Sequence, residues 1–92
     1  MNRIYLNDLY DLYSELLTEK EKSIFEDYYQ NDLSLSEISE NNNVTRNAIH
    51  KSLKTVEEKL NNYEEKLELY KRREEILKLL DKKDYDKIRD II

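Results

Sequence analysis

The chain has 92 residues, contains no glycine, proline or cysteine, and carries a formal net charge of -5. This length allows one domain near the lower limit for a self-sufficient core, so a second copy that buries extra surface would help stability. The lack of glycine and proline almost excludes β-hairpins, and the lack of cysteine excludes disulfides and thiolate metal sites. We therefore predict an all-helical fold.

No apolar run approaches the length that spans a membrane. At the N-terminus, where a signal peptide would lie, Asp8 and Asp11 interrupt the apolar positions. We expect a soluble, cytoplasmic protein without membrane insertion, in which residues 1–92 form a single helical domain.

Two amphipathic helices are predicted ahead of residue 31, and together they would form a platform for the segment that follows. The first spans residues 3–16 and places apolar side chains on one face at helical spacing. The second spans about 19–30 and begins at a capping box made by Thr18 and Glu21. The predicted inward residues are Ile4, Leu6, Leu9, Leu12, Tyr13 and Leu16 in the first helix, and Ile24, Phe25, Tyr28 and Tyr29 in the second.

The segment 35–54, LSEISENNNVTRNAIHKSLK, has the pattern of a helix-turn-helix. Ser34 and Glu37 form a capping box for a helix over 35–41, and Thr45 caps a recognition helix over 45–56. The asparagines 41–43 stand where the chain must turn, and asparagine is the non-glycine residue that best tolerates a left-handed backbone. We predict a helix-turn-helix core over residues 18–56.

Two residues of this corner lead to specific expectations. Val44 is predicted to be a small apolar wedge that, with Ile38 and Ile49, fixes the crossing of the two helices. Asn42 stands where helix-turn-helix units usually have a buried leucine, and burying an amide costs free energy unless it is hydrogen bonded. Either Asn42 bonds a backbone group, or the helix pair is less rigid than in strong DNA binders.

The recognition helix coincides with a basic window of the chain. Residues 1–40 hold 3 basic and 10 acidic side chains, residues 41–56 hold 3 and 0, and residues 57–92 hold 10 and 11. Side chains at the helix start suit base edges and later lysines suit phosphates, whereas the acidic remainder would repel DNA. We predict weak, salt-sensitive binding of duplex DNA unless two copies act together. The predicted DNA-binding residues are Thr45, Arg46, Asn47, His50, Lys51 and Lys54.

These residues also have interpretations that do not involve DNA. Arg46, Lys51 and Lys54 could be ordinary solvated charges of a helix surface. His50 is the single histidine, and with no cysteine or convergent carboxylate motif it indicates neither a catalytic nor a metal site. The eight tyrosines suit packing better than base stacking at their helical spacing. We expect no cofactor, no metal and no enzymatic activity.

The recognition helix is predicted to continue far beyond the motif. Apolar residues alternate four and three apart from Ile49 to Tyr70, which predicts one helix extending to Leu80, with a bend near Asn61 and Asn62 because asparagine is a poor helix interior residue. A corner over 81–84 and a short last helix would follow. The second half of the seam needs either the folded-back C-terminus or a second copy, and residues 57–92 are predicted to form a homodimer. The last helix would carry Tyr85, Ile88, Ile91 and Ile92.

Several short segments between residues 18 and 67 form a recognisable pattern: Thr18-Glu19-Lys20, Tyr28-Tyr29, LSLSEI over 33–38, Val44-Thr45-Arg46 and YEEKL over 63–67. With these segments, residues 18–67 resemble the YlxM family of small bacterial helix-turn-helix proteins and, more distantly, region 4 of sigma factors. The resemblance implies a DNA-binding regulator associated with the signal recognition particle pathway, with dimerisation through the C-terminal helices.

A second functional class stays open beside the first. The acidic N-terminal half would suit a basic partner, so the helix-turn-helix could instead bind a protein or the RNA of the signal recognition particle. A DNA-binding regulator should lose its ligand when Arg46, Asn47 and Lys51 are replaced together by alanine. Co-purification with a partner that survives removal of nucleic acid would instead indicate the second class.

Overall fold

The computed structural model describes residues 2–91, and in this part of the chain all regular structure is helical. The predicted all-helical class is thereby confirmed, while Met1 and Ile92 lie outside the described residues. The elements in chain order are α1 (Arg3–Tyr13), a 3-10 turn (Ser14–Leu16), α2 (Glu19–Tyr29), α3 (Leu35–Asn42), α4 (Arg46–Leu67), α5 (Leu69–Asp81) and α6 (Tyr85–Ile91).

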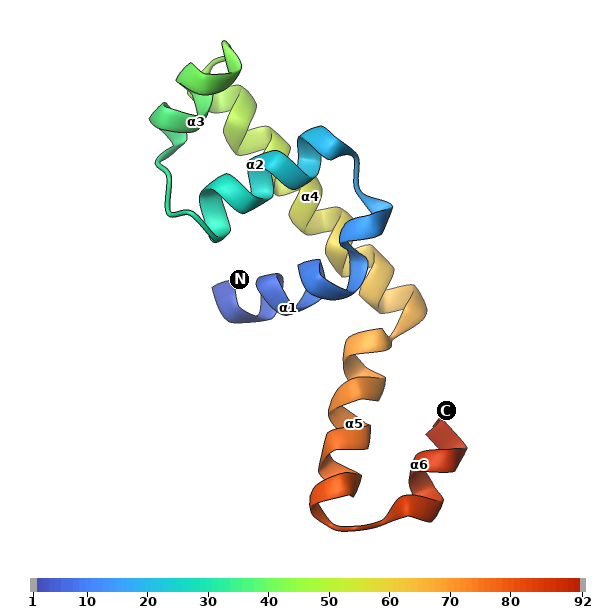
Figure 1. Ribbon diagram of the computed structural model, residues 1–92. Coiled ribbons are helices and arrows are strands. Elements are labelled where there is room, and N and C mark those ends of the chain that lie inside the picture. Colours follow the sequence, from blue (N-terminus) through green and yellow to red (C-terminus); the bar gives the residue numbers. More distant parts are fainter. Residues whose placement is uncertain (1, 92) are drawn as a thin grey trace.

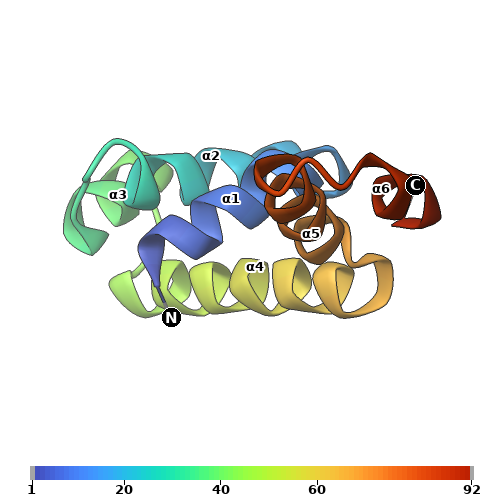
Figure 2. The same ribbon diagram turned by 90° about the horizontal axis from the view of Figure 1, so that it is seen from below.

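Helix α4 is the central element of the fold and contacts α1, α2, α3 and α5. Helices α1, α2 and α3 pack against one side of it, and α5 and α6 form an arm beyond its C-terminal end (Figures 1 and 2). The molecule is accordingly elongated, with principal extents of 53 × 22 × 19 Å. Helix α3 and the corner that joins it to α4 lie at the opposite end of α4 from the arm.

Short-range side-chain caps determine where the first helices begin. The Asn2 side chain accepts hydrogen bonds from the backbone N–H groups of Ile4 and Tyr5, which opens α1. The capping box of Thr18 and Glu21 opens α2, as predicted. These caps satisfy backbone N–H groups that have no partner inside the helix.

The larger core cluster joins α1, α2 and α4. Tyr10 stacks on Phe25 with ring centroids 4.4 Å apart. Tyr10 was not among the predicted inward residues, whereas Ile4, which was, is 74% exposed. The buried face of α1 follows the helical pattern from Leu6 to Tyr13, and Ile4 points to its opposite side. The cluster consists of Leu6, Leu9, Tyr10, Tyr13, Leu17, Phe25, Val56 and Leu60.

The prediction of one helix from the motif to Leu80 is wrong. Helix α4 passes straight through Asn61 and Asn62, where a bend was predicted, and ends at Leu67. Glu68 then takes a left-handed conformation, with φ 55° and ψ 32°, before α5 begins. The Asn61 side chain donates to the Glu57 carbonyl at 2.8 Å, and the neighbouring Leu60 is buried in the core. These contacts outweigh the poor helix propensity of asparagine.

A contact from α1 accounts for the break at Glu68. The Tyr13 hydroxyl donates to Glu64 Oε1 at 2.6 Å and accepts from the backbone N–H of Leu69 at 3.0 Å. The Glu64 carboxylate also accepts from the N–H groups of Tyr70 and Lys71 at 2.9 and 3.1 Å. The first turn of α5 is therefore capped by side chains of α1 and α4, which the heptad spacing could not reveal.

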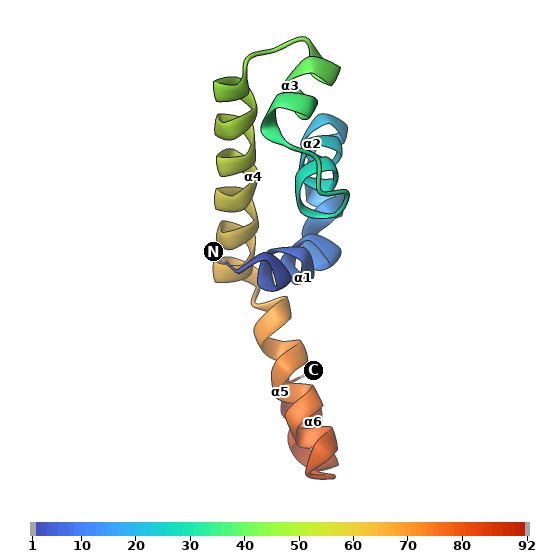
Figure 3. The ribbon, with the colours of Figure 1, turned by 90° about the vertical axis from the view of Figure 1, so that its left-hand side faces the viewer.

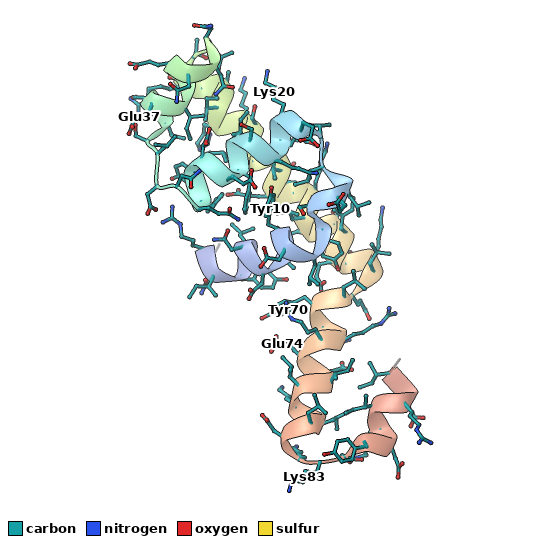
Figure 4. All side chains as sticks on the ribbon, in the orientation of Figure 1. Tyr10, Lys20, Glu37, Tyr70, Glu74 and Lys83 are labelled. Atoms are coloured by element: carbon teal, nitrogen blue, oxygen red, sulfur yellow. The ribbon has the colours of Figure 1, made fainter. Side chains whose placement is uncertain are left out.

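The arm is loosely attached to the rest of the fold. Neither α5 nor α6 contains a buried residue. At the junction with α1, which Figure 4 marks by Tyr70, the rings of Tyr5 and Tyr70 meet edge to face with centroids 5.0 Å apart. The predicted corner is found between Asp81 and Tyr85, with Lys83 at φ 57°.

Candidate nucleic-acid interface

Helices α3 and α4 form the predicted helix-turn-helix, and a small apolar cluster holds them together. Ser34 and Glu37 make the predicted capping box at the start of α3. Ile38 and Ile49, predicted to face each other across the angle, are 0% and 1% exposed. Ile24 of α2 and Leu53 complete the cluster. The orientation of α4 is therefore fixed by contacts with both α2 and α3.

The corner itself is made by asparagine, as predicted. Asn43 is left-handed, with φ 54° and ψ 42°, and its N–H donates to the carbonyls of Ser39 and Glu40. The Asn42 side chain donates to the Ile38 carbonyl at 2.7 Å. The Asn42 amide therefore bonds a backbone group of α3, which is the first of the two alternatives predicted for this residue.

The wedge role predicted for Val44 is wrong. Its side chain is 37% exposed, while its backbone N–H donates to the Ser39 carbonyl at 3.1 Å and so closes the end of α3. Ile24 and Leu53 already fill the space between Ile38 and Ile49. Val44 serves the turn through its backbone rather than through its side chain.

All of the residues predicted to bind DNA lie together on the surface at the start of α4. The Thr45 hydroxyl accepts from the N–H of Ala48 at 3.1 Å and sets where the helix begins. In Figure 3, α2 and α3 cover one side of α4, and its opposite side faces away from the other described helices. The exposed residues are Thr45, Arg46, Asn47, His50, Lys51 and Lys54.

Hollows border this surface on the side of α2 and α3. A shallow hollow of about 640 Å³ is lined by Leu35, Thr45, Arg46, Asn47 and His50. A second one, of about 320 Å³, lies where His50 and Lys54 approach the tyrosines of α2 and has Leu35 and Leu53 at its base. The predicted residues thus form a ridge with a recess beside it, a shape that can follow the edge of a nucleic-acid groove.

Acidic residues mark the end of the basic surface along α4. Glu57 and the exposed Glu58 follow Lys54 by one turn. Tyr29 of α2 donates a hydrogen bond to Glu57. Burial and this hydrogen bond raise the pKa of the Tyr29 hydroxyl, which keeps it protonated as a donor. The basic face is therefore confined to the first turns of α4.

A contact that sequence reasoning missed supports the interface from α1. Arg3 donates to Asp32 Oδ1 at 2.8 Å and to the carbonyl of Tyr28 at 2.9 Å. Asp32 belongs to the loop before α3 and has a positive φ of 55°. Nothing in the local sequence pairs Arg3 with a residue 29 positions away. The one feature that could have indicated this contact is an arginine in the first turn of α1 with no predicted role.

A second support links α2 to α4. Lys59 donates to Glu21 Oε2 at 2.6 Å, while Glu21 Oε1 accepts from the Thr18 backbone N–H at 2.9 Å. Burial acts to raise the pKa of Glu21, but the hydrogen bonds from Lys59 and Thr18 outweigh it and hold the pKa below its ordinary value. The capping box of α2 is thus also an attachment point for α4.

Among residues 2–91, no three histidine, aspartate or glutamate side chains gather in a way that could hold a metal ion. Within the same range, no helix combines the length and apolarity needed to cross a lipid bilayer.

Comparison with known proteins identifies a family that matches this chain. Residues 1–91 match the family described as "UPF0122: Putative helix-turn-helix protein, YlxM / p13 like". The chain is 48% identical over 79 residues to a UPF0122 protein of Thermoanaerobacter sp., which covers 86% of this chain and 68% of the relative. It is 51% identical over 51 residues to a UPF0122 protein of Fusobacterium nucleatum, which covers 55% of this chain and 50% of the relative.

A third relative matches a shorter part of the chain. A UPF0122 protein of Malacoplasma penetrans is 61% identical over 46 residues, which is 50% of this chain and 43% of that protein. The chain thus spans about half the length of several curated relatives that it matches.

Proposed function

Since the chain belongs to the UPF0122 family of YlxM/p13-like helix-turn-helix proteins, we propose that it is a non-enzymatic regulator that binds duplex DNA through the first turns of α4. The observation that carries this proposal is the exposed surface from Thr45 to Lys54, which holds three basic side chains and no carboxylate. Helix-turn-helix proteins place their recognition helix in the major groove, and the ridge occupies the corresponding position on α4.

The residues divide by position on the ridge. Arg46 and Asn47, in the first turn, would reach base edges, because the N-terminal residues of a recognition helix enter the groove deepest. Lys51 and Lys54 would contact phosphates, which position the protein without reading sequence. His50 lies between the two groups, at the edge of both hollows.

The acidic remainder of the chain limits the affinity of one copy, because residues 1–40 carry 10 acidic and 3 basic side chains. We infer that two copies bind together through residues 57–92. The arm exposes Leu77, Leu80 and Tyr85 by 48%, 45% and 60%. Covering these side chains in a dimer would remove apolar surface from water and place two recognition helices on one DNA molecule.

The test is selection of bound sequences from random duplex DNA at about 50 mM salt. Low salt is used because the release of counterions from DNA contributes most to the binding affinity there. The parent protein should enrich a common site, and a variant with Arg46→Ala, Asn47→Ala and Lys51→Ala should not. A matched control, Lys71→Ala with Arg72→Ala, removes the same charge from α5. Equal enrichment by the parent and the α4 variant would refute DNA binding by this surface.

A second candidate function rests on the acidic face of the helix-turn-helix. Helix α3 exposes Glu37, labelled in Figure 4, and Glu40. A hollow of about 480 Å³ on α2 is lined by Glu19, Glu26 and Asp27 among others. A basic partner would complement these surfaces. RNA is itself negatively charged, so the resemblance to the YlxM family points here to a basic protein of the signal recognition particle.

Co-purification separates the two candidates. A protein partner should remain bound after nuclease treatment, and Glu37→Gln with Glu40→Gln should release it. Glu58→Gln with Glu65→Gln, which removes the same charge from exposed positions of α4, serves as the control. A partner that is lost on nuclease treatment would contradict a direct protein contact.

A further inference from the structure

We propose that Lys20 and Lys51 form a second phosphate-binding position, in the hollow between the start of α2 and the middle of α4, for a backbone phosphate beside the groove that α4 enters. This inference rests on the proposed nucleic-acid binding and adds to it. Lys20 lies outside the recognition helix, in the first turn of α2, and was not among the residues predicted to bind.

The hollow has a volume of about 380 Å³, and its lining comes from both helices. Thr18, Lys20 and Glu21 line it from α2, while Lys51, Ser52 and Thr55 line it from α4. Figure 4 shows Lys20 at the start of α2, pointing outward and away from α1. Two amino groups and three hydroxyl groups thus border this hollow. The Thr55 hydroxyl donates to the Lys51 carbonyl at 3.0 Å, so the two amino groups are the main donors that it offers to phosphate oxygens.

The charge in this hollow is available for a ligand. Lys20 and Lys51 are both exposed, and among residues 2–91 neither has a carboxylate within ion-pair distance. Glu21 also lines the hollow, but its carboxylate is held by Lys59 at 2.6 Å and by the Thr18 N–H at 2.9 Å. The paired carboxylate therefore offsets little of the positive charge of the two free lysines.

The position of the hollow suggests a phosphate of the nucleic-acid backbone. On one flank of α4, residues 50 and 54 line the hollow of about 320 Å³ next to the tyrosines of α2. On the other flank, residues 52 and 55 line the hollow that contains Lys20 and Lys51. A helix lying in a major groove has a phosphate chain on each side, and about half or more of protein–DNA hydrogen bonds go to that chain. Lys54 would thus serve one strand, and Lys20 with Lys51 the other.

Lys22 provides a control on the same helix. It is two residues from Lys20 and therefore on a different face of α2. It pairs with Glu19 at 3.4 Å and lines the acidic hollow that includes Glu26 and Asp27. Replacing Lys22 removes the same charge from the protein as replacing Lys20, but it leaves the hollow beside α4 unchanged.

The experiment measures binding of a fluorescein-labelled random-sequence duplex by anisotropy at salt concentrations from about 50 to 200 mM. Lys20→Ala should lower affinity about tenfold at the lowest salt and reduce the slope of log affinity against log salt by about 0.9, the value for one lost phosphate contact. Lys22→Ala should leave the slope unchanged, and Lys20→Arg should restore it. Circular dichroism of each variant establishes that α2 still folds.

The outcomes distinguish this inference from the proposal on which it rests. If the parent binds and the α4 variant does not, but Lys20→Ala behaves like Lys22→Ala, the second phosphate position is overturned and the recognition helix stands. If the parent shows no binding at about 50 mM salt, DNA binding itself fails and the second position fails with it. A slope change in Lys20→Ala alone supports the inference.

Discussion

Single side chains set the geometry of the corner before the recognition helix. Asn43 adopts the left-handed conformation that ends α3, and Asn42 returns a hydrogen bond to the Ile38 carbonyl. Both roles follow from the chemistry of a short amide side chain, which tolerates positive φ and bonds nearby backbone. Consecutive asparagines therefore replace the glycine and the buried leucine that such corners often use.

Replacement of Asn43 tests this explanation. Asn43→Ala should destabilise the protein by about 1 kcal/mol, because a β-carbon without a compensating amide disfavours left-handed backbone. Asn43→Gly should be neutral or stabilising, since glycine adopts this conformation freely. Urea unfolding gives both values from the transition midpoints at constant slope. Equal midpoints for the alanine and glycine variants would contradict the role assigned to this residue.

Glu21 makes stability depend on pH. Its pKa in the folded protein is lowered from the ordinary value of 4.5, so its contacts with Lys59 and Thr18 stabilise the folded state above about pH 4.5. That contribution is lost as the pH falls through the lowered pKa. Glu21→Gln should therefore be less stable than the parent at neutral pH, and the difference should shrink toward pH 3.

Urea midpoints at several pH values between 7 and 3 measure this effect. Glutamine retains the capping geometry of α2, so the comparison isolates the ionic contact with Lys59. Glu65→Gln, at an exposed position of α4, is the control and should follow the parent throughout. A stability difference that stays constant from pH 7 to pH 3 would contradict the assignment to Glu21.

At the scale of elements, the break between α4 and α5 has the largest effect on shape. The apolar spacing through Leu67 and Tyr70 would suit a continuous helix, yet Glu68 is left-handed. Tyr13 and Glu64 cap the new helix start. Burial raises the pKa of the Tyr13 hydroxyl to about 12, helped by its hydrogen bond to Glu64, so the hydroxyl remains a donor over the physiological range.

Removing this hydroxyl tests how the break is maintained. Tyr13→Phe should destabilise the protein by about 1–3 kcal/mol, because it leaves polar partners unsatisfied at a buried position. Tyr63→Phe removes only a bond to the Leu16 carbonyl at 3.2 Å, at an exposed site, and should cost less. A spin-label distance between α4 and α5 should lengthen or broaden in Tyr13→Phe. An unchanged distance and unchanged stability would show that the break persists without Tyr13.

At the scale of the whole molecule, one end carries the basic ridge and the other end carries an arm with exposed apolar side chains. A long α4 connects them. A dimer formed through the arm would hold two ridges at a set separation, which is how helix-turn-helix dimers reach two half-sites. The arm contributes little to the core of its own chain, so its apolar residues are available for this contact.

Light scattering tests the proposed dimer at micromolar concentration. The parent should have the mass of two chains, and Leu77→Asp with Leu80→Asp should have the mass of one, because a carboxylate placed in an apolar contact is costly to desolvate. Ile4→Asp, at another exposed apolar position, should leave the mass unchanged. A parent mass equal to one chain would exclude dimerisation in this concentration range.

The sequence by itself determined the features that arise within a few residues. Helix periodicity, the two capping boxes, the asparagine corner and the basic window were all predicted, because each depends on contacts inside one or two helical turns. The family resemblance was also visible over residues 18–67 and was confirmed by the match over 1–91.

The tertiary structure alone decided the features that join distant residues. Tyr13 bonds Glu64 where the long helix ends, Arg3 bonds Asp32, and Lys20 and Lys51 line one hollow. None of these pairs is encoded by local spacing, since each depends on how α1 and α2 pack against α4. The position of the basic helix could therefore be found in the sequence, whereas its supports and the hollow between Lys20 and Lys51 could be found only in the packed fold.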